Sequence, residues 1–224
     1  MSPLTKVVNK HLLPIYDKPM IFYPISTLVE SGIRSILIVT DKRRAGDFLQ
    51  LLGSGPDFGA RFTYALQDKA LGIADALNKA RDFVNGEDVT VILGDNIFFN
   101  RLNFSTQPLN KIGKVFLKEV SDPYRFGVAR IEGEELVDII EKPKSFVSNL
   151  AVTGIYQYRS EIFDMIDEVK PSERNELEIT DVNRLLIRKG ELSFRVIDDQ
   201  WIDAGTFESL FRAQEIRRMH SKEF

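Results

Sequence analysis

Val89-Thr-Val-Ile-Leu-Gly-Asp-Asn96 is a short apolar run that ends abruptly in a glycine and a carboxylate, and it indicates how the rest of the chain is organised. A β-branched run without polar alternation is typical of a strand buried on both faces of a sheet. In open α/β sheets, ligands bind beyond the carboxyl ends of the strands. The run therefore predicts a strand over Val89–Leu93 that presents Asp95 to a ligand.

The segments before this run repeat an alternation of strand and helix. Ser35–Thr40 and Phe62–Leu66 are further apolar runs of strand length, and a helix from about Pro19 to Ser31 precedes the first of them. A second helix is expected ahead of Val89, because apolar residues recur there at helical spacing. Strand and helix in this order predict a three-layer, Rossmann-like α/β fold with helices on both faces of the sheet.

The segment after this run is richer in strands. Four are expected, at residues 115–119, 126–131, 136–140 and 150–158. A hairpin turn is expected at Glu132–Glu135. Three helices are expected to begin after serine or threonine N-caps, at Ser160, Thr180 and Thr206. We expect a single domain over residues 1–224, with a mixed, mainly parallel sheet and a small β-hairpin region.

The composition excludes several classes of protein. The 224 residues are 43% hydrophobic and 28% charged, with a formal net charge of −3 and no cysteine. A mildly acidic chain lacks the basic surface that nucleic-acid binding requires, and disulfide or thiol chemistry needs cysteine. No apolar run approaches the roughly 20 residues of a membrane-spanning helix. We therefore expect a soluble cytoplasmic protein that binds neither nucleic acid nor a membrane.

Two carboxylates are candidate metal ligands. Asp95 follows a strand and a glycine, and Asp203, in Trp201-Ile-Asp-Ala-Gly-Thr206, precedes a glycine. A carboxylate at a strand end suits Mg²⁺ when the substrate is a nucleotide. Each aspartate equally suits a turn or a helix cap, and the spacing between them does not decide whether they meet in space.

Other polar residues are candidates for phosphate, base or sugar binding. Lys10 lies before the first helix, where a solvated surface lysine is the commoner alternative. Gln67 follows a strand and offers a donor and an acceptor to a base edge. Glu141 and Lys142 end a strand and suit sugar hydroxyls and a phosphate, or equally an exposed rim. His11 has no acidic neighbour in sequence and is assigned no catalytic role.

Taken together, these motifs resemble the sugar-1-phosphate nucleotidyltransferase family, and the resemblance runs almost from end to end. The blocks that carry it are Ser2-Pro-Leu-Thr5, Asn9-Lys-His-Leu-Leu-Pro-Ile-Tyr-Asp-Lys-Pro-Met20, Leu51-Leu-Gly-Ser-Gly55, Gln67-Asp-Lys with Gly72-Ile-Ala74, Leu93-Gly-Asp-Asn-Ile-Phe98, Phe126-Gly-Val128, Glu141-Lys-Pro143, Ala151-Val-Thr-Gly154, Glu176-Leu-Glu-Ile-Thr-Asp181 and Trp201-Ile-Asp-Ala-Gly-Thr206.

The resemblance implies a Mg²⁺-dependent, homo-oligomeric enzyme that joins dTTP and glucose 1-phosphate into dTDP-glucose with release of pyrophosphate. It implies a catalytic role for Lys10 at the phosphates, and for Asp95 and Asp203 as the Mg²⁺ ligands, with Asp95 also in the nucleotide site. Gln67 and Gly72 are implied to read the base.

The resemblance also implies a sugar-phosphate pocket, made of Gly127, Glu141, Lys142 and Val152. Phe126 stands where close relatives often have tyrosine, so a hydroxyl contact there would be lost.

The chain departs from the family pattern at two places. The family's glycine-rich loop, Gly-x-Gly-Thr-Arg-(Leu or Met)-x-Pro, is matched only by its tail at Met1-Ser2-Pro3, and the stretch between Asn100 and Lys114 is shorter than in relatives. Because the loop would cradle the triphosphate, we expect the polypeptide to carry a strand and this loop ahead of Met1. Two alternatives remain: the same chemistry with UTP or another sugar 1-phosphate, and a catalytically silent nucleotide-sugar binding protein.

Overall fold

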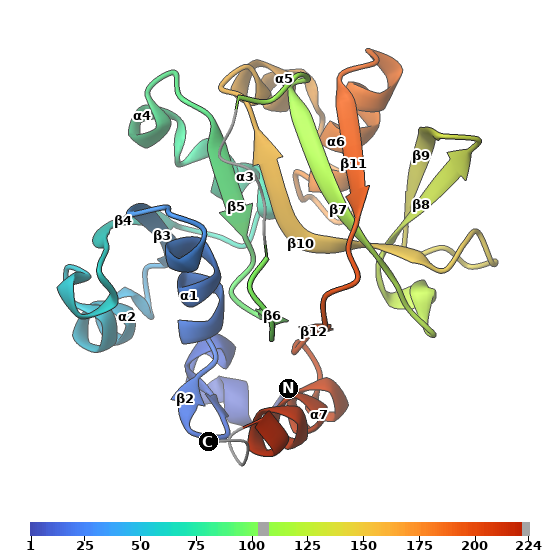
Figure 1. Cartoon of the computed structure of the whole chain (residues 1–224). Helices are drawn as coiled ribbons and strands as arrows, with labels where there is room; N and C mark the ends of the chain where they lie inside the picture. Colours follow the sequence, from blue (N-terminus) through green and yellow to red (C-terminus); the bar gives the residue numbers. More distant parts are fainter. Residues whose placement is uncertain (103–107, 221–224) are drawn as a thin grey trace.

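The structure is a computed structural model that describes residues 1–102 and 108–220 (Figure 1). The shorter stretch between Asn100 and Lys114 lies partly outside these residues. The amino-terminal half alternates strands and helices in the order β1 (Pro14–Ile15), β2 (Lys18–Pro19), α1 (Phe22–Glu30), β3 (Ser35–Asp41), α2 (Ala45–Leu52), β4 (Arg61–Gln67), α3 (Ile73–Asn78), α4 (Arg81–Val84), β5 (Val89–Ile92) and β6 (Asn96–Phe98).

The carboxyl-terminal half forms most of the larger sheet and the helices that cover it. Its elements are β7 (Gly113–Glu119), β8 (Gly127–Glu132), β9 (Glu135–Glu141), β10 (Leu150–Tyr158), α5 (Ile162–Glu168), α6 (Ile179–Arg188), β11 (Leu192–Val196), β12 (Trp201–Asp203) and α7 (Phe207–His220). Among the described residues, no helix is both long enough and apolar enough to cross a bilayer.

The larger sheet is built around β10, which is long enough to serve several neighbours. β7 pairs with it along one edge, β5 pairs with its carboxyl-terminal half, and β8 pairs with it near Ala151. β11 and β9 extend the sheet at its two ends, beyond β7 and β8. Three pairs of strands stand apart from this sheet: β1–β2, β3–β4 and β6–β12.

The predicted α/β class is confirmed, but the expectation of a mainly parallel sheet is wrong for the described strands. Only β3–β4 and β7–β11 are parallel, and the other ladders are antiparallel. The physical reason lies in the connections. β8 and β9 are joined by the predicted hairpin turn, and β10 returns alongside β7 and β8 in the opposite direction. Antiparallel neighbours of this kind need no helical crossover.

Several helices begin or end at residues other than the predicted ones. Pro19 lies in β2, so α1 begins at Phe22. The helix expected before Val89 is broken into α3 and α4. Thr180 lies inside α6 and does not cap it, whereas the Thr206 hydroxyl accepts a hydrogen bond from the Ser209 amide at 3.1 Å, as an N-cap should.

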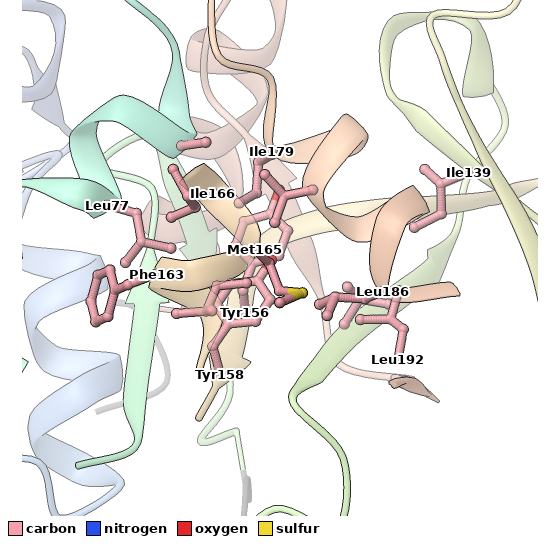
Figure 2. Packing of buried hydrophobic residues seen from close by; sticks show 14 of the residues in the cluster. Leu77, Ile139, Tyr156, Tyr158, Phe163, Met165, Ile166, Ile179, Leu186 and Leu192 are labelled. Carbon is pink, nitrogen blue, oxygen red and sulfur yellow. The ribbon is translucent and has the colours of Figure 1, made fainter. Parts of the chain in front are cut away.

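The main core lies between the larger sheet and the helices α3, α5 and α6 (Figure 2). Tyr156 and Tyr158 of β10 stack at its centre, with ring centroids 6.0 Å apart. The buried Tyr158 hydroxyl donates to Asn183 Oδ1 at 2.7 Å, so its polar atom is satisfied. Each large side chain here contributes about 1.5–3 kcal/mol by burial. This core fixes β10 and, through it, the strands that lead to the site.

A smaller core positions the two short strands β6 and β12. Ile97 and Ile202 lie in these strands and are buried with Ile15 and Met20 beneath α7. α7 contributes Leu210 to the same cluster. Short strands gain little from their own ladder, so this packing is what holds the residues next to Ile97 and Ile202 in place.

Candidate active site

The β6–β12 ladder brings the two candidate metal ligands together. Asp203 pairs in register with Asn96, the residue that follows Asp95. The Ala204 amide donates to the Asp95 carbonyl at 2.8 Å, which closes the two loops against each other. A Cβ on Gly205 would lie 2.8 Å from Asp203 Oδ1 and 3.4 Å from Asp95 Oδ2, so both carboxylates reach the same point. Two aspartates far apart in sequence therefore share one site.

Asn96 fixes this arrangement and was given no role by the sequence. Its side chain is 1% exposed. Its Oδ1 accepts from the Gly154 amide at 2.8 Å and from the Trp201 indole at 2.7 Å, and its Nδ2 donates to Asp95 Oδ1 at 3.1 Å. One side chain thus joins β6, β10 and β12 and aims the Asp95 carboxylate. The adjacency of Asn96 to Asp95 was the only sequence signal for this role.

Lys10 is the cation of the site. Its Nζ lies 2.5 Å from Asp95 Oδ2, and its side chain is 38% exposed, whereas that of Asp95 is 10% exposed. Burial raises the pKa of Asp95, but the charges of Lys10 and His11 and the hydrogen bonds of the carboxylate outweigh it and lower the pKa. Lys10 is therefore a partly exposed lysine paired with a buried carboxylate, and its catalytic role stays a prediction.

Asp203 lies in a less favourable electrostatic environment than Asp95. Burial and the charge of Asp95 raise the pKa of Asp203, against the Gly205 amide, which donates to Asp203 Oδ1 at 2.9 Å. Arg125 approaches the same oxygen at 3.9 Å. Two neighbouring carboxylates with only partly balanced charge form a site that favours a cation.

The two carboxylates, Asp95 and Asp203, suit Mg²⁺ but do not form a complete coordination shell by themselves. Among residues 1–102 and 108–220, no group of three or more His, Asp, Glu or Cys side chains could hold a metal. Mg²⁺ in nucleotide enzymes is bound by one or two carboxylates, with substrate phosphates and water completing the shell. Asp95 and Asp203 match that requirement, because they are two carboxylates that converge at one accessible point.

His11 lies beneath the loop that carries Asp95. A Cβ on Gly94 would stand 3.0 Å from the His11 ring, so a larger residue there would have to push the ring aside by a few tenths of an ångström. Burial lowers the pKa of His11 to about 4, the Asp95 charge raising it and the Lys10 charge lowering it. The imidazole is therefore neutral at pH 7, and the expectation that His11 is not catalytic stays a prediction.

Acid is expected to destabilise the protein through His11. Between pH 6.5 and 4 the unfolded chain binds a proton at this residue and the folded chain does not, so stability falls as pH falls. Comparing pH 7 with pH 4.5, we expect the native protein to lose about 2–3 kcal/mol more than His11→Leu. Urea unfolding of both proteins at the two pH values measures this, and the contributions of carboxylates other than Asp95, whose pKa depends on the His11 charge, cancel in the difference. Parallel losses in the two proteins would contradict it.

The base-reading candidates lie together at the end of β4. Gln67 Nε2 donates to Asp75 Oδ2 at 2.8 Å and to the Gly72 carbonyl at 3.1 Å. With both amide hydrogens engaged, the Gln67 Oε1 is the atom that can accept from a ligand. Gly72 has φ +98, and a Cβ there would lie 2.3 Å from the Leu177 carbonyl, so only glycine fits. The sequence did not identify Asp75, which orients the amide.

The sugar-phosphate candidates gather where β8 meets β9. Gly127 pairs in register with Glu141, and a Cβ on Gly127 would stand 3.3 Å from Glu141 Oε2. The Thr180 hydroxyl donates to the same oxygen at 2.8 Å. Lys142 Nζ lies 3.8 Å from Glu141 Oε1.

Two further residues define this part of the site. Val152 lies in β10, next to Ala151, the residue at which β10 pairs with β8. Its side chain is half-buried against the main core. The Phe126 ring packs against Trp201 at an interplanar angle of 54°, with ring centroids 5.3 Å apart, so it lies beside the Asp203 strand.

A cavity of about 860 Å³ opens onto these groups. Gln67, Gly72, Gly94, Glu141 and Lys142 line it. Gln67 and Gly72 therefore face the same space as Glu141 and Lys142, whereas Gly127 and Val152 do not line it, and the Asp95 loop borders it through Gly94. An arrangement of two carboxylates, a lysine at their side and a mainly apolar cavity with a few polar side chains beside them can bind a cation with a phosphorylated ligand.

Comparison with known proteins gives a consistent result. A profile of the family described as "Nucleotidyl transferase" matches residues 1–218. Glucose-1-phosphate thymidylyltransferase of Neisseria meningitidis serogroup A is 41% identical over 236 residues, which cover 98% of this chain and 81% of that protein. The enzyme of the same name from Mycolicibacterium smegmatis is 39% identical, over 97% of this chain and 78% of its own length.

Two solved structures share the fold. A Bacillus anthracis protein assigned as a glucose-1-phosphate thymidylyltransferase, solved with sucrose, is 47% identical with a TM-score of 0.91, over 97% of this chain and 90% of that one. A UDP-glucose pyrophosphorylase in complex with UDP-glucose is 26% identical with a TM-score of 0.82, over 98% of this chain and 94% of that one.

Proposed function

Because the chain belongs to the nucleotidyl transferase family, we propose that it transfers the thymidylyl group of dTTP to glucose 1-phosphate, giving dTDP-glucose and pyrophosphate. The observation that carries the proposal is the meeting of Asp95, Asp203 and Lys10 beside a cavity lined by Gln67 and Glu141. The names of the curated relatives supply the substrates.

The reaction needs charge cancellation more than proton transfer. An oxygen of the sugar phosphate attacks the α-phosphorus of the nucleotide, a new P–O bond forms, and the bond to the β-phosphate breaks to release pyrophosphate. The attacking phosphate is already an anion near neutral pH, because its second pKa is about 6. No general base is required, in accord with a neutral His11 buried under Gly94. Positioning and electrostatics must therefore provide the catalysis.

Lys10, Asp95 and Asp203 would act on the nucleotide side. Bound Mg²⁺ would be held by the two aspartates and would supply charge stabilisation at the α-phosphate. The Lys10 ammonium lies 2.5 Å from Asp95 Oδ2, so it would stand close to phosphates held by a metal ion on that carboxylate. Asn96 keeps the Asp95 carboxylate aimed by its Nδ2 hydrogen bond.

Gly127, Glu141, Lys142 and Val152 would bind the sugar phosphate. Glu141 is held by Thr180 and offers carboxylate oxygens to sugar hydroxyls. Lys142 has φ +42, an uncommon conformation for a residue with a side chain, and its amide donates to the Phe126 carbonyl at 2.9 Å. Lys142 also lines the cavity, and its Nζ lies 3.8 Å from Glu141 Oε1.

Gln67→Ala is expected to lower kcat/KM for dTTP by roughly ten- to a hundredfold, since a buried base edge without its partner costs about 1–3 kcal/mol. Asp75→Asn, which weakens the hydrogen bond that orients Gln67 and the ion pair with Lys79, should give a smaller loss of the same sign. Steady-state rates of pyrophosphate release with dTTP, UTP and ATP measure both. Equal losses for all three nucleotides would show that Gln67 does not read the base.

A pyrophosphate-release assay with glucose 1-phosphate tests the proposed function directly. We expect dTTP to be used best, UTP less well and purine triphosphates poorly. The solved UDP-glucose relative makes the uridylyl reaction the second candidate, and a higher kcat/KM with UTP would establish it. Nucleotide-sugar binding without turnover in a folded protein would identify a catalytically silent binding protein instead.

We further propose that the enzyme is a cytoplasmic homo-oligomer. Support comes from α7, which leaves Phe207 46% and Phe211 59% exposed, and exposed aromatic residues are typical of interfaces between subunits. Light scattering coupled to gel filtration measures the mass in solution. A mass of 25.6 kDa, the value for one chain, would contradict the oligomer.

A further inference from the structure

Arg125, to which the sequence gave no role, brings a second positive charge to the aspartate pair. Its Nη2 lies 3.9 Å from Asp203 Oδ1, while Lys10 Nζ lies 2.5 Å from Asp95 Oδ2. Burial raises the pKa of Asp203, and the charge of Arg125 is among those that lower it. Each carboxylate therefore faces a cation from a different part of the chain, and Arg125 offsets part of the negative charge that would attract a further cation.

The backbone around Arg125 is fixed by local hydrogen bonds. Arg125 ends a 3₁₀ turn, Pro123–Arg125, in which Pro123 is buried. The Phe126 amide closes this turn by donating to the Pro123 carbonyl at 3.1 Å, and the Phe126 carbonyl accepts from the Lys142 amide at 2.9 Å. The turn is thus tied to the β9 side of the site, and Arg125 stands at a defined place beside it.

The side chain of Arg125 lies against an aromatic wall. Its guanidinium carbon is 5.4 Å from the centre of the Phe126 ring, this ring packs against Trp201, and the Trp201 indole donates to the buried Asn96. Attraction between a cation and a ring face holds a guanidinium in such a position. Because Asp203 lies two residues beyond Trp201 in β12, the wall holds the charge of Arg125 beside that carboxylate.

The guanidinium remains available to another anion. A separation of 3.9 Å from Asp203 is that of an ion pair and exceeds the length of a hydrogen bond. The Arg125 side chain is 40% exposed, and a guanidinium can bind two phosphate oxygens at once. Gly127, two residues further on, pairs in register with Glu141. A phosphate held by these sugar-phosphate candidates would therefore lie near Arg125.

We propose that Arg125 couples metal binding to phosphate binding, by competing with a divalent cation for Asp203 until the phosphate of the sugar substrate takes up the guanidinium. The inference rests on the proposed function, in which Asp95 and Asp203 hold the metal. The Arg125 charge opposes a cation that binds alone. A phosphate that binds the guanidinium removes this opposition, so metal and sugar phosphate strengthen each other's binding by equal factors.

Mn²⁺ binding without substrates, followed by electron paramagnetic resonance, tests the competition. Arg125→Gln removes the charge and keeps a polar side chain, so we expect its Kd for Mn²⁺ to be roughly three- to tenfold lower than that of the native protein. Arg125→Lys keeps the charge and should lie closer to the native value. Arg130→Gln is the matched control, because Arg130 is an exposed arginine whose partner is Glu132, at 3.7 Å. Its Kd should equal the native one.

The same titration with glucose 1-phosphate tests the coupling. At saturating glucose 1-phosphate, the native protein should bind Mn²⁺ roughly tenfold more tightly than without it. Glucose, which lacks the phosphate, should have no effect. In Arg125→Gln the enhancement by glucose 1-phosphate should fall to less than about a third of the native factor. Circular dichroism and thermal unfolding confirm that each variant is folded.

The outcomes separate this inference from the function on which it rests. Equal Mn²⁺ affinity in the native protein and Arg125→Gln would overturn the competition, and equal enhancement by glucose 1-phosphate would overturn the coupling. Tighter binding in Arg130→Gln as well would show a general effect of net charge and would also overturn the proposal. Mn²⁺ that binds Asp203→Asn as tightly as the native protein would remove the metal site itself, and with it both this inference and the proposed mechanism.

Discussion

Asp95→Asn and Asp203→Asn are each expected to reduce kcat by roughly a thousandfold or more. The two carboxylates converge on one point near Gly205, and a metal clamp at such a point contributes several kcal/mol to a phosphoryl-type transition state. A loss of about 4 kcal/mol corresponds to a thousandfold in rate. Pyrophosphate release at saturating dTTP and glucose 1-phosphate measures the effect.

The controls separate a lost metal ligand from a damaged fold. Asp198→Asn alters an exposed carboxylate close in sequence to Asp203, and its kcat should match the native value. Thermal unfolding of all variants reports on the fold, and Mn²⁺ binding followed by electron paramagnetic resonance reports on the site itself. Turnover like that of the native protein in both folded aspartate variants would remove Asp95 and Asp203 from the mechanism.

Asn96→Ala is expected to lower the free energy of unfolding by about 3–5 kcal/mol. The change leaves the Gly154 amide and the Trp201 indole without the acceptor they share, and each buried unsatisfied donor costs about 1–3 kcal/mol. For a chain of this size the loss corresponds to a fall in Tm of roughly 10 °C. Urea unfolding with the slope and midpoint fitted separately gives the free energy.

Two further variants complete that experiment: a second substitution at Asn96 and a control substitution at an exposed asparagine. Asn96→Asp keeps an acceptor for both donors but sets a third carboxylate beside Asp95 and Asp203, so we expect a smaller loss of stability with a clear loss of activity. Asn110→Ala changes an exposed asparagine and should leave both unchanged. A loss below 1 kcal/mol for Asn96→Ala would show that Asn96 does not hold the strands together.

The sequence was most informative where a segment's own chemistry decides its structure. β10 spans the predicted residues 150–158, and β3 and β5 agree with the predicted strands to within a residue at either end. The hairpin turn at Glu132–Glu135 was also predicted, because a glycine between two apolar runs leaves few alternatives. α2 was missed, as were β6, β11 and β12, which are short and have weak patterns of their own.

Features that depend on distant contacts could not be predicted from local patterns. The spacing of Asp95 and Asp203 says nothing of the β6–β12 ladder that joins them. Thr180 was read as a helix cap because of its residue type, whereas its hydroxyl serves Glu141 from another element. The family resemblance named Lys10, Asp95 and Asp203, which the structure brings together, but it gave no role to Asn96 or Asp75, whose importance lies in the partners they hold.

The separation of β3–β4 from the larger sheet has a thermodynamic consequence. Unfolding is cooperative when no part of a molecule can melt without also breaking the contacts that stabilise the rest. β3 and β4 share a ladder only with each other in the described chain, so they depend on side-chain packing alone for their coupling to the other strands. We therefore expect β3 and β4 to melt before β7 and β10. In scanning calorimetry, the van't Hoff enthalpy would then be smaller than the calorimetric enthalpy, which is the total heat absorbed. A strand shared by both sheets would merge the two transitions into one.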